Sequence, residues 1–104
     1  MPRLLVVWTR PNHLTAEEAD RWVRRELRAV VAEEAVRSAK LSRLEQASPR
    51  HGGDWRWLLE LEISGSVRDC VERGPCAEWL GDLRLLGMKV EVAVAADTVA
   101  LGAG

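Results

Sequence analysis

The chain has 104 residues with 15 basic and 16 acidic side chains, which gives a formal net charge of -1. This length fits one domain with a modest core, and the interspersed charges exclude a strong basic field for steering nucleic acid. The 47% hydrophobic and 30% charged fractions are typical of a globular protein and exclude wholesale disorder.

Targeting and metal-binding signals are missing from the sequence. The apolar run at residues 3–8 is too short for a signal sequence, and no apolar segment approaches the roughly 20 residues that span a bilayer. Cys70 and Cys76 are too few for a disulfide framework and lack metal-knuckle spacing. We therefore expect a cytoplasmic protein without a membrane partner, a metal or another cofactor.

The first predicted elements are a strand and a helix. Residues 3–10 form a continuous Leu/Val/Trp run, typical of a strand buried on both faces, and Pro11 and Asn12 end it. Thr15 with Glu18 three residues later is a capping box, which marks the start of a helix. Its predicted buried stripe is Ala19, Val23, Leu27 and Val30.

Two strands are predicted next. The second lies within residues 35–45, where the alternation slips near Arg43 and Leu44 as a bulge would make it do. A turn-rich connection over residues 48–53 leads to a third strand over residues 54–63. One face of that strand carries Trp55, Trp57, Leu59, Leu61 and Ile63. The other face carries Arg56, Leu58, Glu60 and Glu62.

A broken helix and a last strand complete the pattern. Ser66 caps the helix, and Gly74 followed by Pro75 interrupts it because proline cannot continue the preceding turn. The second piece runs to about Leu86, and Gly87 ends it. Residues 88–95 alternate as a fourth strand, which closes a single domain over residues 1–95. Residues 96–104 are predicted to be a flexible tail.

This βαββαβ order predicts a ferredoxin-like α+β sandwich, with four antiparallel strands and two helices on one face. The opposite face of the sheet has an apolar centre that includes Leu5, Val7 and Leu58, with charged residues on its flanks. A second copy covering that face explains why the first strand is so apolar. We therefore expect a homodimer formed through the open sheet face.

In element order, length and apolar first strand, the chain resembles the dimeric α+β barrel superfamily. The resemblance covers nearly the whole chain and implies two protomers packed sheet to sheet, with a pocket between the sheet and helices of each. Members of the superfamily include cofactor-independent monooxygenases, haem-degrading enzymes, polyketide cyclases and isomerases. The resemblance thus implies a small-molecule site.

The chain has five tryptophans but no phenylalanine or tyrosine. The predicted strand and helix directions bring all five, together with His13 and His51, toward one end of the sandwich. The indoles either fill the core or line a pocket for a flat hydrophobic or aromatic ligand, with His51 at its mouth. The five candidate ligand-binding indoles are Trp8, Trp22, Trp55, Trp57 and Trp79.

Three polar residues at the same end are catalytic candidates. His13 can exchange protons near neutral pH, Asn12 can donate to an oxyanion, and Arg10 can clamp an enolate or carboxylate. The alternative for each is an exposed loop, turn or strand-end residue. Three functions remain open: a cofactor-independent monooxygenase or cyclase/isomerase acting on a hydrophobic or aromatic substrate, a ligand-binding or regulatory module without turnover, and a dimerising interaction protein.

Overall fold

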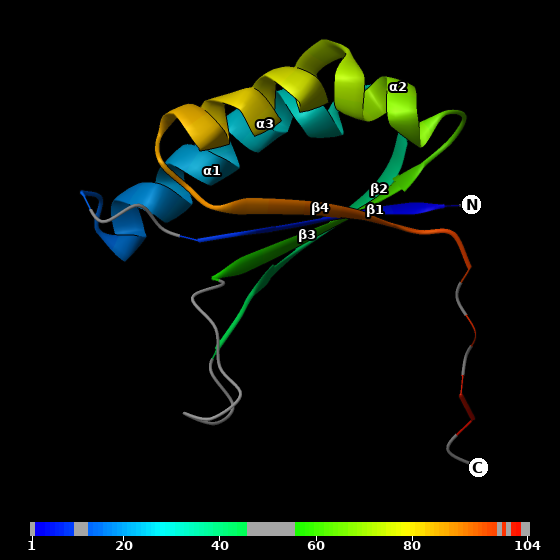
Figure 1. Ribbon diagram of the computed structural model, residues 1–104, viewed down its shortest axis with the longest axis horizontal. Coiled ribbons are helices and arrows are strands. Elements are labelled where there is room, and N and C mark those ends of the chain that lie inside the picture. Colours follow the sequence, from blue (N-terminus) through cyan, green and yellow to red (C-terminus); the bar gives the residue numbers. More distant parts are fainter. Residues whose placement is uncertain (1, 10–12, 46–55, 98, 100, 103–104) are drawn as a thin grey trace.

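The computed structural model describes residues 2–9, 13–45, 56–97, 99 and 101–102 (Figure 1). The strands form one antiparallel sheet in the order β2-β3-β1-β4, and the helices lie together on one face of it. This confirms the predicted ferredoxin-like α+β sandwich. The elements in chain order are β1 (Arg3–Trp8), α1 (Ala16–Val31), β2 (Val36–Arg43), β3 (Trp57–Ile63), α2 (Val67–Glu72), α3 (Gly74–Leu85) and β4 (Val90–Ala95).

Helix α1 begins at the predicted capping box. The Thr15 hydroxyl accepts a hydrogen bond from the Glu18 backbone N–H at 3.1 Å, and the Glu18 carboxylate accepts one from the Thr15 N–H at 3.2 Å. Hydrogen bonding of the Glu18 carboxylate to the Thr15 side chain and to the Thr15 backbone N–H lowers the pKa of the Glu18 carboxyl, because it favours the charged form. The predicted stripe of α1 is buried in the core: Ala19, Val23, Leu27 and Val30.

The second helical segment is divided where the sequence predicts. Gly74 has a φ of +78°, which glycine adopts without strain, and Pro75 occupies the first turn of α3. Arg73 at the N-cap makes no side-chain hydrogen bond to α3. Instead, Glu33 reaches over from the turn after α1 and accepts a hydrogen bond from the Cys76 backbone N–H at 2.9 Å. A carboxylate from another element thus caps α3.

The strands are shorter than predicted: β1 ends at Trp8 rather than at residue 10, and β3 begins at Trp57 rather than at residue 54. The register shift of β2 lies between Val36 and Ser38, not near Arg43 and Leu44. Pairing stays regular at that end, where the Leu44 N–H donates to the Arg56 carbonyl at 2.7 Å. β4 begins at Val90 rather than at residue 88. The reason is that the N–H of buried Met88 donates to the Leu83 carbonyl and closes the end of α3.

The two faces of the sheet are covered unequally. On β1, Leu4, Val6 and Trp8 face the helices and have no exposed surface, whereas Leu5 and Val7 on the other face are only half-buried. The first strand is therefore not buried on both faces within one protomer. Arg3 and Glu60 form an ion pair of 3.9 Å on that open face, at the edge of its apolar centre.

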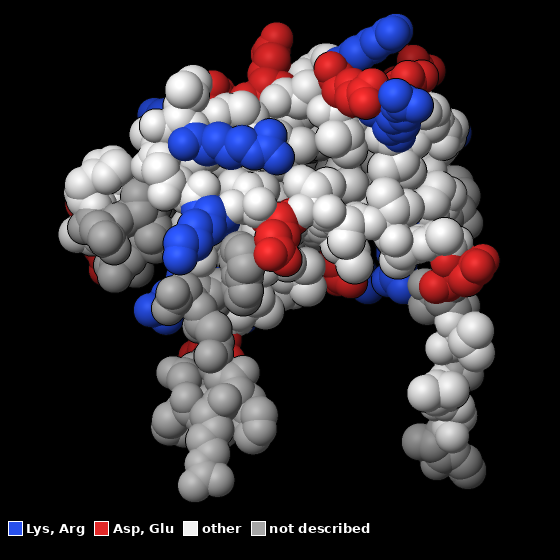
Figure 2. All heavy atoms as spheres, in the orientation of Figure 1, with Lys and Arg blue, Asp and Glu red and all other residues white. Residues whose placement is uncertain are grey.

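Charge on the molecular surface is mixed. Acidic and basic side chains lie beside one another on the face shown in Figure 2, with the densest mixture over α2. No helix in the described part of the chain is long and apolar enough to cross a membrane. After β4, the tail leads away from the sheet in Figure 1, and its described residues include exposed Val99 and Leu101.

Candidate functional site

Three of the tryptophans meet in the core between the sheet and the helices. The rings of Trp8 and Trp57 are stacked, with centroids 6.1 Å apart and planes at 14°. Trp79 meets Trp8 edge to face, with centroids 5.1 Å apart and planes at 88°. Trp8 and Trp79 are almost completely inaccessible to solvent. These two indoles therefore fill the core in the geometry that aromatic pairs prefer.

The polar atoms of these two indoles are not used within the core. The Nε1 atoms of Trp8 and Trp79 are buried and have no hydrogen-bond acceptor among the described residues. A buried donor without a partner costs about 1–3 kcal/mol. Within the described residues, Trp8 and Trp79 thus stabilise the fold through buried apolar area and ring contacts rather than through their N–H groups.

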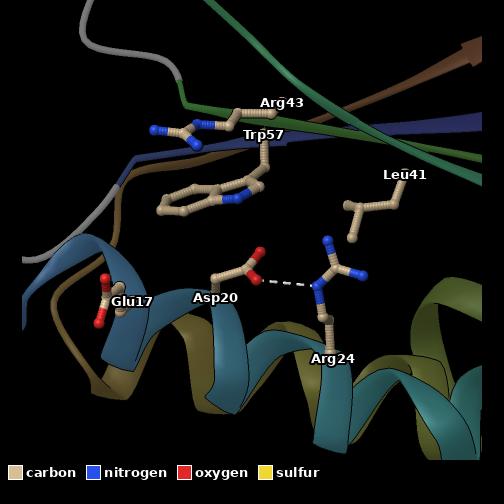
Figure 3. Close-up of a pocket in the computed structure, with 6 residues that line it drawn as sticks. All are labelled: Glu17, Asp20, Arg24, Leu41, Arg43 and Trp57. Carbon is tan, nitrogen blue, oxygen red and sulfur yellow. Dashed lines mark hydrogen bonds and ion pairs between the residues drawn. The ribbon is translucent and has the colours of Figure 1, made fainter.

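A cavity of about 330 Å³ lies beside this cluster, between α1 and the paired ends of β2 and β3. In Figure 3 the Trp57 indole lies between Arg43 and the first turns of α1, with Leu41 further along the strand. Trp57 is 4% exposed: it stacks on Trp8 in the core, and its remaining surface lines this cavity. The described lining is Glu17, Asp20 and Arg24 of α1, Leu41 and Arg43 of β2, and Trp57 of β3.

Register and helical periodicity bring these residues together. Arg43 stands directly opposite Trp57 in the β2–β3 ladder, so both side chains are on the helix-facing side of the sheet. The residues from α1 are spaced three and four apart, which places Glu17, Asp20 and Arg24 on one flank of the helix. That flank faces the edge strand β2.

The charges of the cavity are only partly compensated. Arg24 Nε donates to Asp20 Oδ2 at 2.8 Å, so this pair is neutral as a unit. Within the described residues, Glu17 and Arg43 form no ion pair and are free to contact a ligand. The cavity therefore offers an aromatic wall, one guanidinium and one carboxylate. Such a set can hold a flat molecule and fix its orientation through a polar group.

The other predicted site residues are distributed differently. Trp22 lies on the opposite flank of α1, in a hollow of about 240 Å³ that it shares with Glu26, Asp82, Leu85 and Leu86. His13 is exposed in the turn before α1 and is absent from the described lining of the Trp57 cavity. Four predicted residues lie outside the described part of the chain: Arg10, Asn12, His51 and Trp55.

Sequence reasoning missed most of the cavity lining. The signal for the helical part was present, because Glu17, Asp20 and Arg24 follow the three-and-four spacing of a single helical flank. The contribution of β2 to the lining could not be predicted from the sequence, because the position of the bulge in β2 decides on which face of the sheet Arg43 lies.

The two cysteines form a separate buried cluster. Cys70 and Cys76 are free thiols, and Cys70 Sγ lies 3.9 Å from Glu33 Oε2. Burial raises the pKa of Cys76 to about 12, with the neighbouring Cys70 adding to the effect, and burial also raises the pKa of Cys70. Protonated thiols of this kind are poor nucleophiles. The described residues contain no group of three or more His, Cys, Asp or Glu side chains that could hold a metal ion.

Comparison with solved structures identifies the fold. The chain is similar to the solved structure of an Arabidopsis thaliana protein at 13% identity and a TM-score of 0.74, over 97% of this chain and 99% of that one. It is also similar to a dimeric α+β barrel (DABB) family protein with a ferredoxin-like fold from Mesorhizobium loti, at 20% identity and a TM-score of 0.65, over 97% of each chain. The chain has the fold of the dimeric α+β barrel proteins.

Other similar structures carry different descriptions. One is a Deinococcus radiodurans protein described as an antibiotic biosynthesis monooxygenase, at 9% identity and a TM-score of 0.66, over 98% of this chain and 97% of that one. Two more are ferredoxin-like proteins described as dimeric and of unknown function. The sequence matches no protein-family model and no curated protein sequence. At these identities the likeness establishes the fold.

Proposed function

We propose that this protein is a homodimer that binds a flat hydrophobic or aromatic small molecule in the cavity between α1 and the sheet of each protomer. The observation that carries the proposal is the cavity wall formed by Trp57, with the Arg43 guanidinium beside it, which has no ion-pair partner in the described part of the chain. An indole face favours a planar ligand, and a guanidinium favours a carboxylate or enolate on that ligand.

The dimer part of the proposal rests on the open sheet face. Leu5, Val7 and Leu58 give this face an apolar centre that the described part of the chain leaves half-exposed. Similar structures of this fold are described as dimeric. A second copy packed sheet to sheet would remove this apolar area from water, which favours association. Sedimentation should show a dimer at tens of micromolar protein, and a monomer there would contradict this part.

For an enzyme, the proposed reaction is cofactor-independent monooxygenation or a cyclisation or isomerisation of the bound molecule. The similar Deinococcus radiodurans protein supports the monooxygenase class. In this proposal His13 exchanges the proton, Asn12 stabilises developing negative charge, and Arg10 clamps the anionic group. Turnover that survives both His13→Ala and Asn12→Ala would remove these roles and leave the binding site intact.

A binding or regulatory module without turnover is the second candidate, and one observation favours it. The described lining of the cavity contains two carboxylates and two guanidinium groups but no imidazole and no thiol. The proposed setting is the cytoplasm for both candidates. Persistent ligand binding without any product, measured by chromatography of the recovered ligand, would select this candidate over the enzyme.

Fluorescence titration with 2-naphthoate tests the binding proposal directly. Binding beside Trp57 should quench tryptophan emission, and Arg43→Gln should raise the Kd about tenfold because a charge-assisted hydrogen bond is lost. Arg84→Gln is the matched control, since Arg84 is an exposed residue of α3 away from the cavity. Emission that falls no further than the absorbance of millimolar naphthoate accounts for would contradict the proposal.

A further inference from the structure

A second hollow lies on the same flank of α1 as the Trp57 cavity. It has a volume of about 420 Å³ and is lined by Arg24, Leu27, Arg28, Val31 and Ala32. Arg24 lines both hollows, so they adjoin along the helix. At a rise of 1.5 Å per residue, the flank from Glu17 to Val31 is about 21 Å long. The two hollows together form a groove that follows α1, called the α1–β2 groove below.

The chemistry of the α1–β2 groove changes along its length. The end at Trp57 carries the charged groups described above, whereas the far end is lined by apolar Leu27, Val31 and Ala32. Val31 is 46% exposed, so its side chain is accessible to a ligand at this end. An apolar surface continuous with a polar cavity is typical of a site for a molecule with two unlike ends.

The strand side of the groove is uncovered in the same region. Ala39 and Leu41 stand opposite Leu61 and Leu59 in the β2–β3 ladder, so they belong to the helix-facing side of the sheet. Leu61 and Leu59 are buried, but Ala39 is exposed. β2 is the edge strand, and the exposure of Ala39 leaves this part of its helix-facing side open to a ligand.

The unpaired charges along the groove favour an anion. Within the described residues, Arg28 and Arg43 form no ion pair, whereas Arg24 is already paired with Asp20. Glu17 is the one unpaired carboxylate of the described lining. Arg28 lies at the far end of the groove, so Arg43 is the unpaired guanidinium at the Trp57 end, where it can bind a carboxylate in a specific planar geometry.

We infer that the α1–β2 groove binds an amphiphilic organic acid, with its planar anionic head beside Trp57 and Arg43 and its alkyl chain along Leu27 and Val31. The inference rests on the function proposed above and names the ligand class for that site. The aliphatic stem of Arg28 borders the chain-binding end, where it adds apolar surface while its charged group stays in water.

Calorimetric titration of the full chain with 2-naphthoate, 6-butyl-2-naphthoate and 6-hexyl-2-naphthoate tests this inference. Each added methylene should lower the Kd about threefold until the apolar end of the groove is filled, because burying one methylene contributes a roughly constant free energy. Val31→Gln should remove most of this dependence on chain length. Val31 is exposed, so the variant should fold.

Two further variants make the result specific. Leu85→Gln replaces an 86% exposed leucine on the other side of the helix layer and should leave the chain-length dependence as it is. Arg43→Gln should raise the Kd of all three acids by about the same factor, because it acts on the head group.

The outcomes separate this inference from the proposed function. If 2-naphthoate binds but the alkyl chains bring no gain in affinity, the amphiphile inference is wrong and the proposed function stands. If the gain in affinity is present but survives Val31→Gln and falls with Leu85→Gln, the alkyl chain of the ligand binds on the Trp22 side of α1. The inference is then also wrong. If none of the acids binds, both are wrong.

Discussion

The two flanks of helix α1 differ in how neighbouring elements cover them. On the flank toward α3, Trp22 and Glu26 border a hollow together with residues of α3, and Glu33 in the turn beyond α1 caps that helix. On the flank toward β2, Glu17, Arg24 and Val31 border hollows totalling several hundred cubic ångströms. A second helix packs against the first flank and leaves a smaller hollow of about 240 Å³ there, whereas no described helix covers the second. A cavity thus arises in this fold where two helices leave an edge strand uncovered.

The largest expected effect is a loss of stability from a substitution in the packed core. Trp79→Ala removes an indole that is 2% exposed and meets Trp8 edge to face, so it should lower the free energy of unfolding by about 3–5 kcal/mol. Leu41→Ala, in the wall of the open cavity, should cost about 1 kcal/mol because its side chain is only partly buried. Urea denaturation followed by circular dichroism measures both. Equal losses would mean that the two flanks are packed alike.

The next effect concerns the cap of α3. Glu33→Ala leaves the Cys76 N–H at the helix start without its acceptor and should cost about 1–2 kcal/mol. Glu33→Gln keeps an acceptor oxygen at the same reach and should cost less. Glu17→Ala on the open flank serves as the control and should change stability by no more than about 0.5 kcal/mol. A loss at Glu17 matching that at Glu33 would contradict the contrast between the flanks.

The N-terminal cap of α1 contributes less to the free energy of unfolding. Thr15→Ala removes the acceptor for the Glu18 N–H and should cost about 1 kcal/mol, whereas Thr15→Ser keeps the hydroxyl and should cost only a few tenths. The Glu18 pKa is lowered in the folded state, so its contribution is present above the unfolded pKa and is lost as the pH falls through the folded value. The difference between wild type and Thr15→Ala should therefore shrink in acid. A difference that stays constant from neutral pH into acid would contradict this coupling.

The smallest effect at neutral pH is that of the buried thiols. The pKa of Cys76 is raised from 9.0 to about 12, so the folded state holds this proton more tightly than the unfolded state does. Its contribution is complete below pH 9 and should be lost as the pH rises from 9 toward 12. Unfolding titrations at several alkaline pH values should show a steeper loss for wild type than for Cys76→Ala. Parallel curves would mean that this thiol is accessible to water.

The parts of the structure that depend on neighbouring residues were predictable. The Thr15–Glu18 capping box and the break at Gly74 and Pro75 depend on local backbone geometry, and both are present. The βαββαβ order, which follows from hydrophobic periodicity, led to the correct ferredoxin-like sandwich. The cap of α3 was not predictable, because Glu33 and Cys76 are 43 residues apart in the sequence.

The tryptophans show where prediction from the sequence ends. Strand and helix directions brought Trp8, Trp57 and Trp79 to one end, and these three do meet. Whether indoles touch or enclose space depends on register and rotamers, which periodicity does not specify. Trp22 takes the opposite flank of α1 because its position on the helix differs from that of Asp20 and Arg24.

Indole N–H resonances of the five tryptophans offer the most direct test of the central claim, that the flank of α1 toward β2 is the ligand site. Two-dimensional NMR spectra recorded during a titration with 2-naphthoate, with the signals assigned by single substitutions such as Trp22→Phe, report on both flanks at once. The structure predicts that the Trp57 signal moves furthest while the Trp22 signal stays in place. Movement of the Trp22 signal with a stationary Trp57 signal would contradict it.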